Sequence, residues 1–183
     1  MILVYVNSSN GLSKAALETV TYAKKLGNEV VVLTNGKASS ESLICLGEYG
    51  ATKVLVDRMV DGEDPQQLTR LISAVVQNIG AKTVIFSHDL IGKAVAPRLS
   101  VRLQAGLIAG AISIPDVDGA VKVNVFSGKA IGNVKVSSAI KIISLLPNSI
   151  QPEKTGANCP VEETNGLRGT AAIKVISTKN ACE

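Results

Sequence analysis

The sequence predicts an α/β fold in which helices cover both faces of a mostly parallel sheet, with antiparallel strands added in the C-terminal part. Apolar residues make up 46% of the 183-residue chain and aromatic residues only 3%. The core must therefore consist of Val, Ile, Leu and Ala, as in sheets that are buried on both faces. Up to about residue 103, short β-branched runs alternate with amphipathic helical patterns. This alternation is typical of right-handed βαβ units and predicts a Rossmann-like architecture.

The first half of the chain is expected to hold four strands and four helices. Ser13 is a suitable N-cap for the first helix, and Gly27 is a suitable residue to end it. Asp64 followed by Pro65 is a strong helix start, because Asp caps the helix and Pro is favoured at its first position. The expected strands are 2–7, 29–34, 53–57 and 83–87, and the expected helices are about 13–27, 40–49, 65–80 and 92–103.

Strand patterns dominate after residue 106. Asp118-Gly119 is typical of a hairpin turn, and we interpret the stretch 126–130 as a second turn rather than as a binding site. The expected strands here are 109–117, 120–127, 133–136 and 139–145, and residues 147–170 have the Pro, Gly and Asn content of a loop. We therefore expect one α/β domain over 1–150 and a linker or tail over 151–183, with room for a last strand at 171–177.

Composition argues against several classes of function. The net charge is +4, with the basic residues spread along the chain, whereas nucleic-acid binding needs a concentrated basic face. Cys45, Cys159 and Cys182 lack the spacing of a metal site or a disulfide framework, which favours reduced thiols in a cytoplasmic protein. We expect Cys45 in the core and the other two in a polar tail. No apolar run reaches the roughly 18 residues that a membrane span needs.

Familiar catalytic and nucleotide-binding motifs are missing from the sequence. It contains no Gly-x-Gly-x-x-Gly, no P-loop and no Gly-x-Ser-x-Gly. The single histidine, His88, stands between Ser87 and Asp89. Consecutive residues in a turn point in different directions, so these three are not expected to form a catalytic triad. The sequence therefore predicts no catalytic residue and no metal site.

The best candidate for a binding site is the segment SHDLIGKAVAPRLSVRL, residues 87–103. It follows the fourth expected strand, and parallel sheets bind ligands at the carboxyl ends of their strands. A helix that begins near Gly92 would offer free backbone N–H groups to an anion, and Lys93 and Arg98 would add positive charge. The alternative is structural: Gly92 permits a turn, Lys93 is solvated, and Arg98 bonds a neighbour. The candidate nucleotide or anion loop consists of Ser87, His88, Asp89, Gly92 and Lys93.

Several segments of the chain resemble the N-terminal domain of the α subunit of electron-transfer flavoproteins. AALETVTYAKKLGNEVVVLTNG (15–36) is similar to the first helix and second strand of that family, and EYGATKVLVDR (48–58) to the entry into its third strand. SHDLIGKAVAPRLSVRLQAGL (87–107) is similar to its loop and helix around Pro-Arg-Leu, and residues 118–149 to its closing strands. The resemblance covers about residues 1–150 and implies an adenine nucleotide alpha hydrolase-like fold.

This resemblance implies an electron-carrier component rather than a catalyst. In the family, an α and a β subunit form a heterodimer, and this domain supplies scaffold and subunit contact. FAD is held mainly by a second α domain outside the matched part, so no flavin-binding residue is carried over. In the sister β subunit the equivalent loop binds AMP, although His88 and Lys93 replace the small hydroxyl residue and the Arg that the α family usually has. The expected partner is a β-subunit-like protein, or a second copy in a homodimer.

Two other functions remain open on the sequence. One is a stand-alone adenine-nucleotide-binding module without a redox role. The other is a hydrolase or ligase of the same fold, which the sequence disfavours because Asn7-Ser8-Ser9 replaces a Ser-Gly-Gly phosphate loop and no paired-histidine motif occurs.

Overall fold

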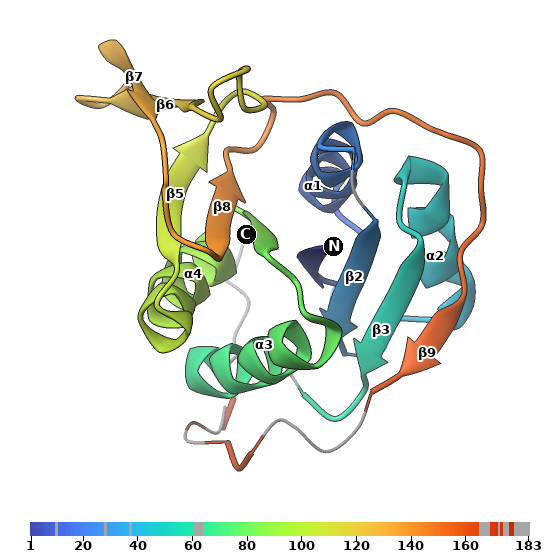
Figure 1. Cartoon of the computed structure of the whole chain (residues 1–183). Coiled ribbons are helices and arrows are strands. Elements are labelled where there is room, and N and C mark those ends of the chain that lie inside the picture. Colours follow the sequence, from blue (N-terminus) through green and yellow to red (C-terminus); the bar gives the residue numbers. More distant parts are fainter. Residues whose placement is uncertain are drawn as a thin grey trace, which may run out of the picture.

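The computed structural model describes residues 1–9, 11–27, 29–36, 38–60, 64–164, 169–171, 173 and 176–177. These residues form a sheet with the strand order β7-β6-β5-β8-β4-β1-β2-β3-β9 and with helices on both faces (Figure 1). The α/β fold predicted from the alternating patterns is confirmed. None of the helices in the described ranges combines the length and apolar character that a bilayer-spanning helix needs.

The centre of the sheet is parallel. Each strand pairs with its neighbour in the order β8-β4-β1-β2-β3. The chain first moves from β1 through β2 to β3 and then returns to place β4 on the other side of β1, so the order of strands reverses between β1 and β4. These strands are β1 (Ile2–Asn7), β2 (Val30–Asn35), β3 (Lys53–Asp57), β4 (Thr83–Ser87) and β8 (Lys141–Leu145).

Helices cover the two faces of the sheet and divide the core. Side chains alternate along β1, as they do in any strand. Val4 packs in the cluster that contains α1 and α2 residues, whereas Leu3 and Tyr5 pack in the cluster under α3 and α4. The helices are α1 (Lys14–Lys25), α2 (Ser40–Ile44), the 3-10 helix η1 (Cys45–Tyr49), α3 (Pro65–Ile79) and α4 (Leu90–Leu103).

The helix ends follow the local signals, with one exception. Ser13 Oγ accepts the N–H of Ala16 at 3.2 Å, and Asp64 Oδ1 accepts the N–H of Gln66 at 2.8 Å. Both expected caps are therefore confirmed. The exception is α4, which begins at Leu90 behind the cap Asp89, two residues before the expected start. Gly92 thus lies inside the first turn of α4 instead of opening the helix.

The C-terminal strands include the expected antiparallel pairs. β5 (Gly106–Ala111) lies parallel to β8, while β6 (Val121–Val125) pairs antiparallel with β5 and with β7 (Ala130–Val134). The β6–β7 hairpin projects from the edge of the sheet, at the upper left in Figure 1. The chain then crosses back to β8, which is inserted between β4 and β5.

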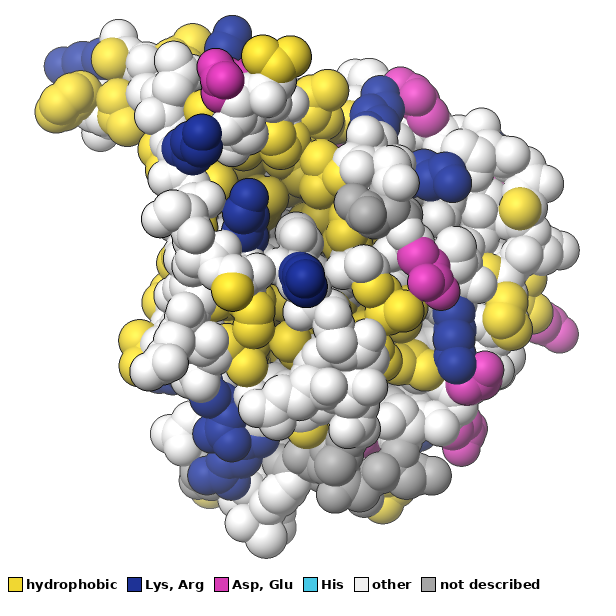
Figure 2. Space-filling view, viewed as in Figure 1, with side chains coloured by type: hydrophobic (Ala, Val, Ile, Leu, Met, Phe, Trp, Pro, Cys, Tyr) yellow, Lys and Arg dark blue, Asp and Glu magenta, His cyan; other side chains and the backbone are white. Residues whose placement is uncertain are grey.

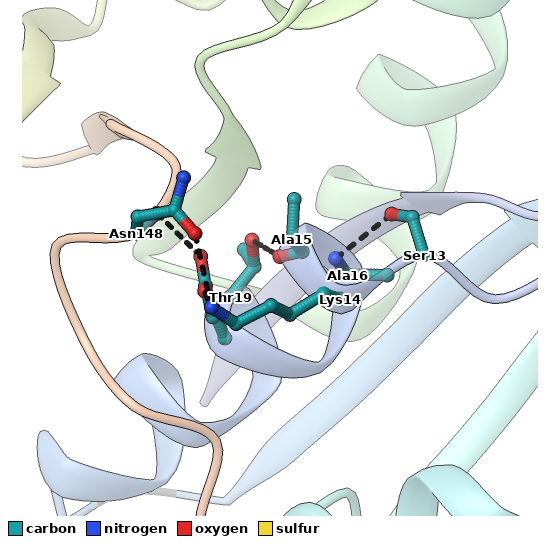
Figure 3. A network of polar contacts seen from close by, with 7 residues as sticks. Ser13, Lys14, Ala15, Ala16, Thr19 and Asn148 are labelled. Carbon is teal, nitrogen blue, oxygen red and sulfur yellow. Dashed lines mark hydrogen bonds and ion pairs between the residues drawn. The ribbon is translucent and has the colours of Figure 1, made fainter.

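The segment after β8 is attached to α1 by a buried carboxylate. Glu18 is 1% exposed, its Oε2 accepts the backbone N–H of Asn148 at 2.8 Å, and its Oε1 lies 3.5 Å from Lys14 Nζ. Lys14 Nζ also donates to Asn148 Oδ1 at 3.0 Å. Figure 3 shows Lys14 and Asn148 converging on this contact from α1 and from the loop after β8.

The rest of this segment contributes an edge strand that the sequence interpretation missed. β9 (Val161–Glu163) pairs parallel with β3, and Lys25 Nζ contacts Glu153 Oε1 at 2.6 Å on the way. The stretch expected to be a loop after residue 150 therefore enters the same sheet. Of the strand expected at 171–177, residues 172, 174 and 175 lie outside the described residues, and the other four belong to no strand.

The environments of Cys45 and Cys159 are the reverse of those expected, and Cys182 lies outside the described residues. Cys45 is exposed and Cys159 is buried. Gly47 explains the second observation, since a Cβ there would lie 2.5 Å from the backbone N of Cys159. The absence of a side chain at Gly47 lets the segment around Cys159 pack directly on η1.

Candidate functional site

A cavity of about 250 Å³ lies at the carboxyl ends of β1 and β4, where the strand order reverses. Ligands bind open parallel sheets at this position, because the loops and helix starts that follow the two strands diverge there. The cavity is lined by Tyr5, Val6, Asn7, Gly11, Leu12, Ser13, Ala16, Phe86, Ser87, Asp89 and Gly92. The candidate loop therefore forms one wall, and the segment after β1 forms the other.

Asp89 occupies the N-terminus of α4. Its Oδ1 accepts the N–H of Gly92 at 2.9 Å, and its backbone carbonyl accepts the N–H of Lys93 at 2.9 Å. A carboxylate at a helix N-terminus is stabilised by the helix dipole. The same charge occupies the position where an anion was expected to bind, so the helix end is already neutralised by the chain itself.

Gly92 is required for packing. A Cβ at this position would lie 1.9 Å from the carbonyl oxygen of Ser87. Only glycine lets the first turn of α4 approach the end of β4 this closely. The alternative interpretation, that Gly92 permits a turn, is wrong because Gly92 lies within α4, and its close approach to Ser87 accounts for the glycine without a ligand.

Ser87 presents a hydroxyl group at the cavity. Its Oγ is buried and makes no hydrogen bond to any residue that the structure describes. A buried hydroxyl without a partner is unfavourable by about 1–3 kcal/mol. Ser87 is therefore the side chain of the candidate loop with most capacity to bind a ligand.

His88 turns toward the neighbouring strands. Its Nδ1 lies 2.9 Å from Ser144 Oγ on β8, and that Oγ accepts the N–H of Gly110 on β5 at 3.2 Å. Burial lowers the pKa of His88 below its usual value of 6.5, the positive charge of Lys93 lowers it further, and Asp89 opposes the shift. A neutral imidazole thus links β4, β5 and β8 and is a structural contact outside the cavity lining.

Lys93 and Arg98 also lie away from the cavity. Lys93 is exposed and is absent from the lining, and Arg98 Nη1 donates to the carbonyl of Ala94 within α4 at 2.7 Å. Of the candidate residues, the structure brings Ser87, Asp89 and Gly92 to the cavity but not His88 or Lys93.

The wall formed by β1 was missed by sequence reasoning. Tyr5 OH donates to Asn35 Oδ1 at 2.6 Å, and Asn35 Nδ2 donates to the carbonyl of Val60 at 3.1 Å. Burial raises the pKa of Tyr5, and the charge of Asp89 adds to this shift. Tyr5 therefore lines the cavity with a neutral side chain that its hydrogen bond to Asn35 holds in place. The polar run from Asn7 to Gly11 directly after the first strand was the signal that could have identified this wall.

The comparisons with known proteins agree with the architecture. The family model described as the electron transfer flavoprotein domain matches residues 2–166. The chain belongs to the electron transfer flavoprotein domain family. The family expected from the sequence segments is confirmed, and the match extends beyond residue 150 to include strand β9.

Several relatives of this electron transfer flavoprotein domain are α subunits. The chain is 32% identical over 131 residues to the electron transfer flavoprotein subunit alpha of Bacillus subtilis, covering 67% of this chain and 38% of that protein. It is 25% identical over 164 residues to the probable mitochondrial subunit alpha of Caenorhabditis elegans, covering 88% and 49%. It is 27% identical over 166 residues to the subunit alpha of Syntrophomonas wolfei, covering 87% and 52%. The chain spans about half the length of the curated relatives that it matches, or less.

The cavity of this electron transfer flavoprotein domain does not fit FAD. Its volume is about 250 Å³, while drug-sized ligands, which are smaller than a flavin dinucleotide, occupy about 300–1,000 Å³. Among the described residues, Asp89 is the only acidic or basic one in the lining, so no described cation there would face a pyrophosphate. In the part of the chain that the structure describes, no group of three His, Cys, Asp or Glu side chains could hold a metal ion.

The β6–β7 hairpin is a second surface with unusual features. Phe126 is 79% exposed and Ile131 is 62% exposed. Phe126 and Ser127 both adopt positive φ angles, 52° and 55°, which is unfavourable for residues other than Gly, Asn and Asp. In Figure 2, apolar side chains also gather between the hairpin and α1. The tip thus presents an aromatic ring to solvent in a strained backbone conformation.

Proposed function

We propose that this domain is the scaffold and subunit-contact part of an electron-transfer flavoprotein, and that the β6–β7 hairpin contacts a β-subunit-like partner. The observation that carries the proposal is the exposed, strained Phe126 at the hairpin tip. Exposed aromatic residues in well-defined positions are common anchors of protein interfaces. Strained backbone is retained where the surroundings or the function require it.

The charge of the hairpin restricts the kind of partner. Lys122, Lys129 and Lys135 are exposed, and residues 120–140 contain no Asp or Glu. A complementary surface would have an apolar pocket for Phe126 with carboxylates at its rim. We therefore infer a β-subunit-like protein with such a pocket, in preference to a second copy of this basic hairpin.

The test uses the purified chain and a purified electron-transfer flavoprotein β subunit from the same source. We expect a 1:1 complex by light scattering and about a tenfold or greater loss of affinity for Phe126→Ala. Val101→Ala is the matched control, because Val101 is an exposed apolar residue on α4, 81% exposed. Equal affinities of both variants, or a stable homodimer of the chain alone at micromolar concentration, would overturn the assignment.

In this proposal, FAD is bound by the complete electron-transfer flavoprotein and not by this domain alone. The group would supply the electron-carrying chemistry when bound, and the described cavity does not accommodate it. We therefore expect the purified chain to be colourless once unbound FAD has been removed by gel filtration. Flavin absorption bands that remain after gel filtration would contradict this placement.

A second candidate function is a nucleotide-binding module, supported by the cavity at the strand switch. Ser87 and Asp89 offer a hydroxyl and a carboxylate, and the carboxylate favours the hydroxyl groups of a ribose over a phosphate. We thus propose that Ser87 and Asp89 bind an adenosine group. The other members of the candidate loop, His88, Gly92 and Lys93, do not contact it in this proposal. Calorimetry with adenosine and AMP tests this proposal. It predicts that Asp89→Asn weakens adenosine binding, and a lack of heat with either ligand would exclude it.

A further inference from the structure

Three arginines from two helices line one hollow between α3 and α4. Arg70 comes from α3, and Arg98 and Arg102 come from α4, with Gln66 and Thr69 completing a space of about 210 Å³. Figure 2 shows basic side chains gathered at the lower left, where α4 and α3 lie in Figure 1. Asp89 and Arg98 are nine residues apart on α4, about 14 Å along the axis. The hollow is therefore separate from the cavity at the strand switch.

These arginines have no carboxylate partner among the described residues. The ion pairs of the described chain involve other cations: Lys14, Lys25, Lys53, Arg58 and Lys154. Arg98 and Arg70 donate one N–H each to backbone carbonyls, those of Ala94 and Thr170. A guanidinium stays charged at all physiological pH values, so three positive charges face one small space in which the acceptors among the described residues are neutral.

Helix stability does not account for this grouping. Arg102 lies in the last turn of α4, where a cation interacts favourably with the helix dipole. Arg98 stands four residues earlier on the same helix, and like charges at this spacing repel each other. Arg70 adds a third charge from the neighbouring helix. An anion in the hollow would offset all three charges at once.

We propose that this hollow binds a phosphate-bearing anion through Arg70, Arg98 and Arg102. The planar guanidinium matches the geometry of phosphate oxygens and can donate two parallel hydrogen bonds. A space of about 210 Å³ suits one or two phosphate groups rather than a whole dinucleotide. Gln66 is exposed at the rim and adds an amide donor. The site is independent of the β6–β7 hairpin and of the cavity at the strand switch.

Calorimetry of the intact chain with pyrophosphate at low salt tests the proposal. We expect saturable binding that weakens about tenfold or more in Arg98→Gln/Arg102→Gln, and that weakens as salt screens the charges. Lys122→Gln/Lys129→Gln is the matched control, because it removes the same net charge from the hairpin. All four side chains are exposed, so circular dichroism should show an unchanged fold in both variants.

Two further comparisons identify which phosphate compound is bound and whether it binds at this hollow or beside Lys93. Similar affinities for pyrophosphate and AMP would mean that the phosphate alone is recognised, whereas a much tighter AMP complex that still needs Arg98 and Arg102 would identify a nucleotide phosphate. The proposal is overturned if the unmodified chain does not bind at millimolar pyrophosphate. It is equally overturned if the control pair loses as much affinity, or if Lys93→Gln abolishes binding while Arg98→Gln/Arg102→Gln does not.

Discussion

The carboxyl edge of the parallel sheet and the β6–β7 hairpin are built in opposite ways. At the edge, Gly92 lies in close contact with Ser87, and Asp89 caps its own helix. Tyr5 and Asn35 are hydrogen-bonded to each other. At the hairpin, Phe126 is exposed and its backbone is strained. The edge shows how a fold fixes a site through internal contacts. The hairpin shows the opposite case: its tight turn, closed by the N–H of Gly128 donating to the carbonyl of Val125 at 3.1 Å, holds Phe126 at a positive φ angle and leaves its ring exposed to solvent.

The largest expected effect comes from adding a methyl group at the edge. Gly92→Ala would place Cβ 1.9 Å from the Ser87 carbonyl oxygen, so α4 must shift away from β4. We expect a loss of about 3 kcal/mol or more in the free energy of unfolding. The control is Gly132→Ala on the hairpin, where the nearest atom would be 3.5 Å away. Chemical denaturation of both variants measures the difference, and a similar loss in both would remove the contrast between the two regions.

Glu18→Ala should have the next largest effect. The substitution leaves the N–H of Asn148 without its acceptor and Lys14 without its carboxylate. We expect about 2–3 kcal/mol of destabilisation. Glu18→Gln keeps the size and one carbonyl oxygen and should cost less. Thermal unfolding provides the measurement, and equal melting temperatures for the parent and Glu18→Ala would show that the loop after β8 is held by other contacts.

Phe126→Asn is expected to stabilise the isolated chain. Asn tolerates a positive φ angle far better than Phe, and the exposed ring contributes little packing. We expect a gain of about 0.5–1 kcal/mol in the free energy of unfolding, together with weaker binding of the β subunit. Opposite changes in stability and affinity are what a strained binding residue predicts. A variant that is less stable than the parent would indicate that Phe126 packs within the chain.

The smallest expected effect is the contribution of His88 to the pH dependence of the free energy of unfolding. Its folded pKa lies below 6.5 because of burial and Lys93, so the unfolded state binds the proton more readily. Stability from this group is complete above 6.5 and decreases as pH falls through 6.5 toward the folded pKa. We expect His88→Asn to unfold with a shallower decline in stability over that interval. An NMR titration that places the imidazole pKa above 6.5 would contradict this prediction, because protonation of His88 would then stabilise the fold.

The elements of the first half could be predicted because their signals are local. The Ser13 cap, the Asp64-Pro65 helix start and the limits of β3 and β4 depend on neighbouring residues and on side-chain periodicity, and all agree with the structure. The start of α4 was placed two residues late. A glycine that is needed for packing has the same appearance in a sequence as one that opens a turn.

The family could also be predicted from the sequence, because whole segments such as 87–107 resemble it.

Only half of the candidate site could be predicted. Ser87, Asp89 and Gly92 follow one strand and could be found together, whereas Tyr5 and Asn7 reach the same cavity from a strand about 80 residues away. That contact depends on β1 and β4 being neighbours, which no local pattern specifies.

The sequence by itself determined most helices and strands of the first half, the parallel α/β class and the family, since these follow from periodicity, capping residues and contiguous motifs. Only the tertiary structure decided that β8 lies between β4 and β5, that β9 completes the edge beside β3, and that Arg70 meets Arg98 and Arg102 in one hollow. The physical reason is that strand pairing and helix packing join residues far apart in the chain. Their free energies depend on the complementarity of two surfaces, and a single stretch of sequence contains only one of them.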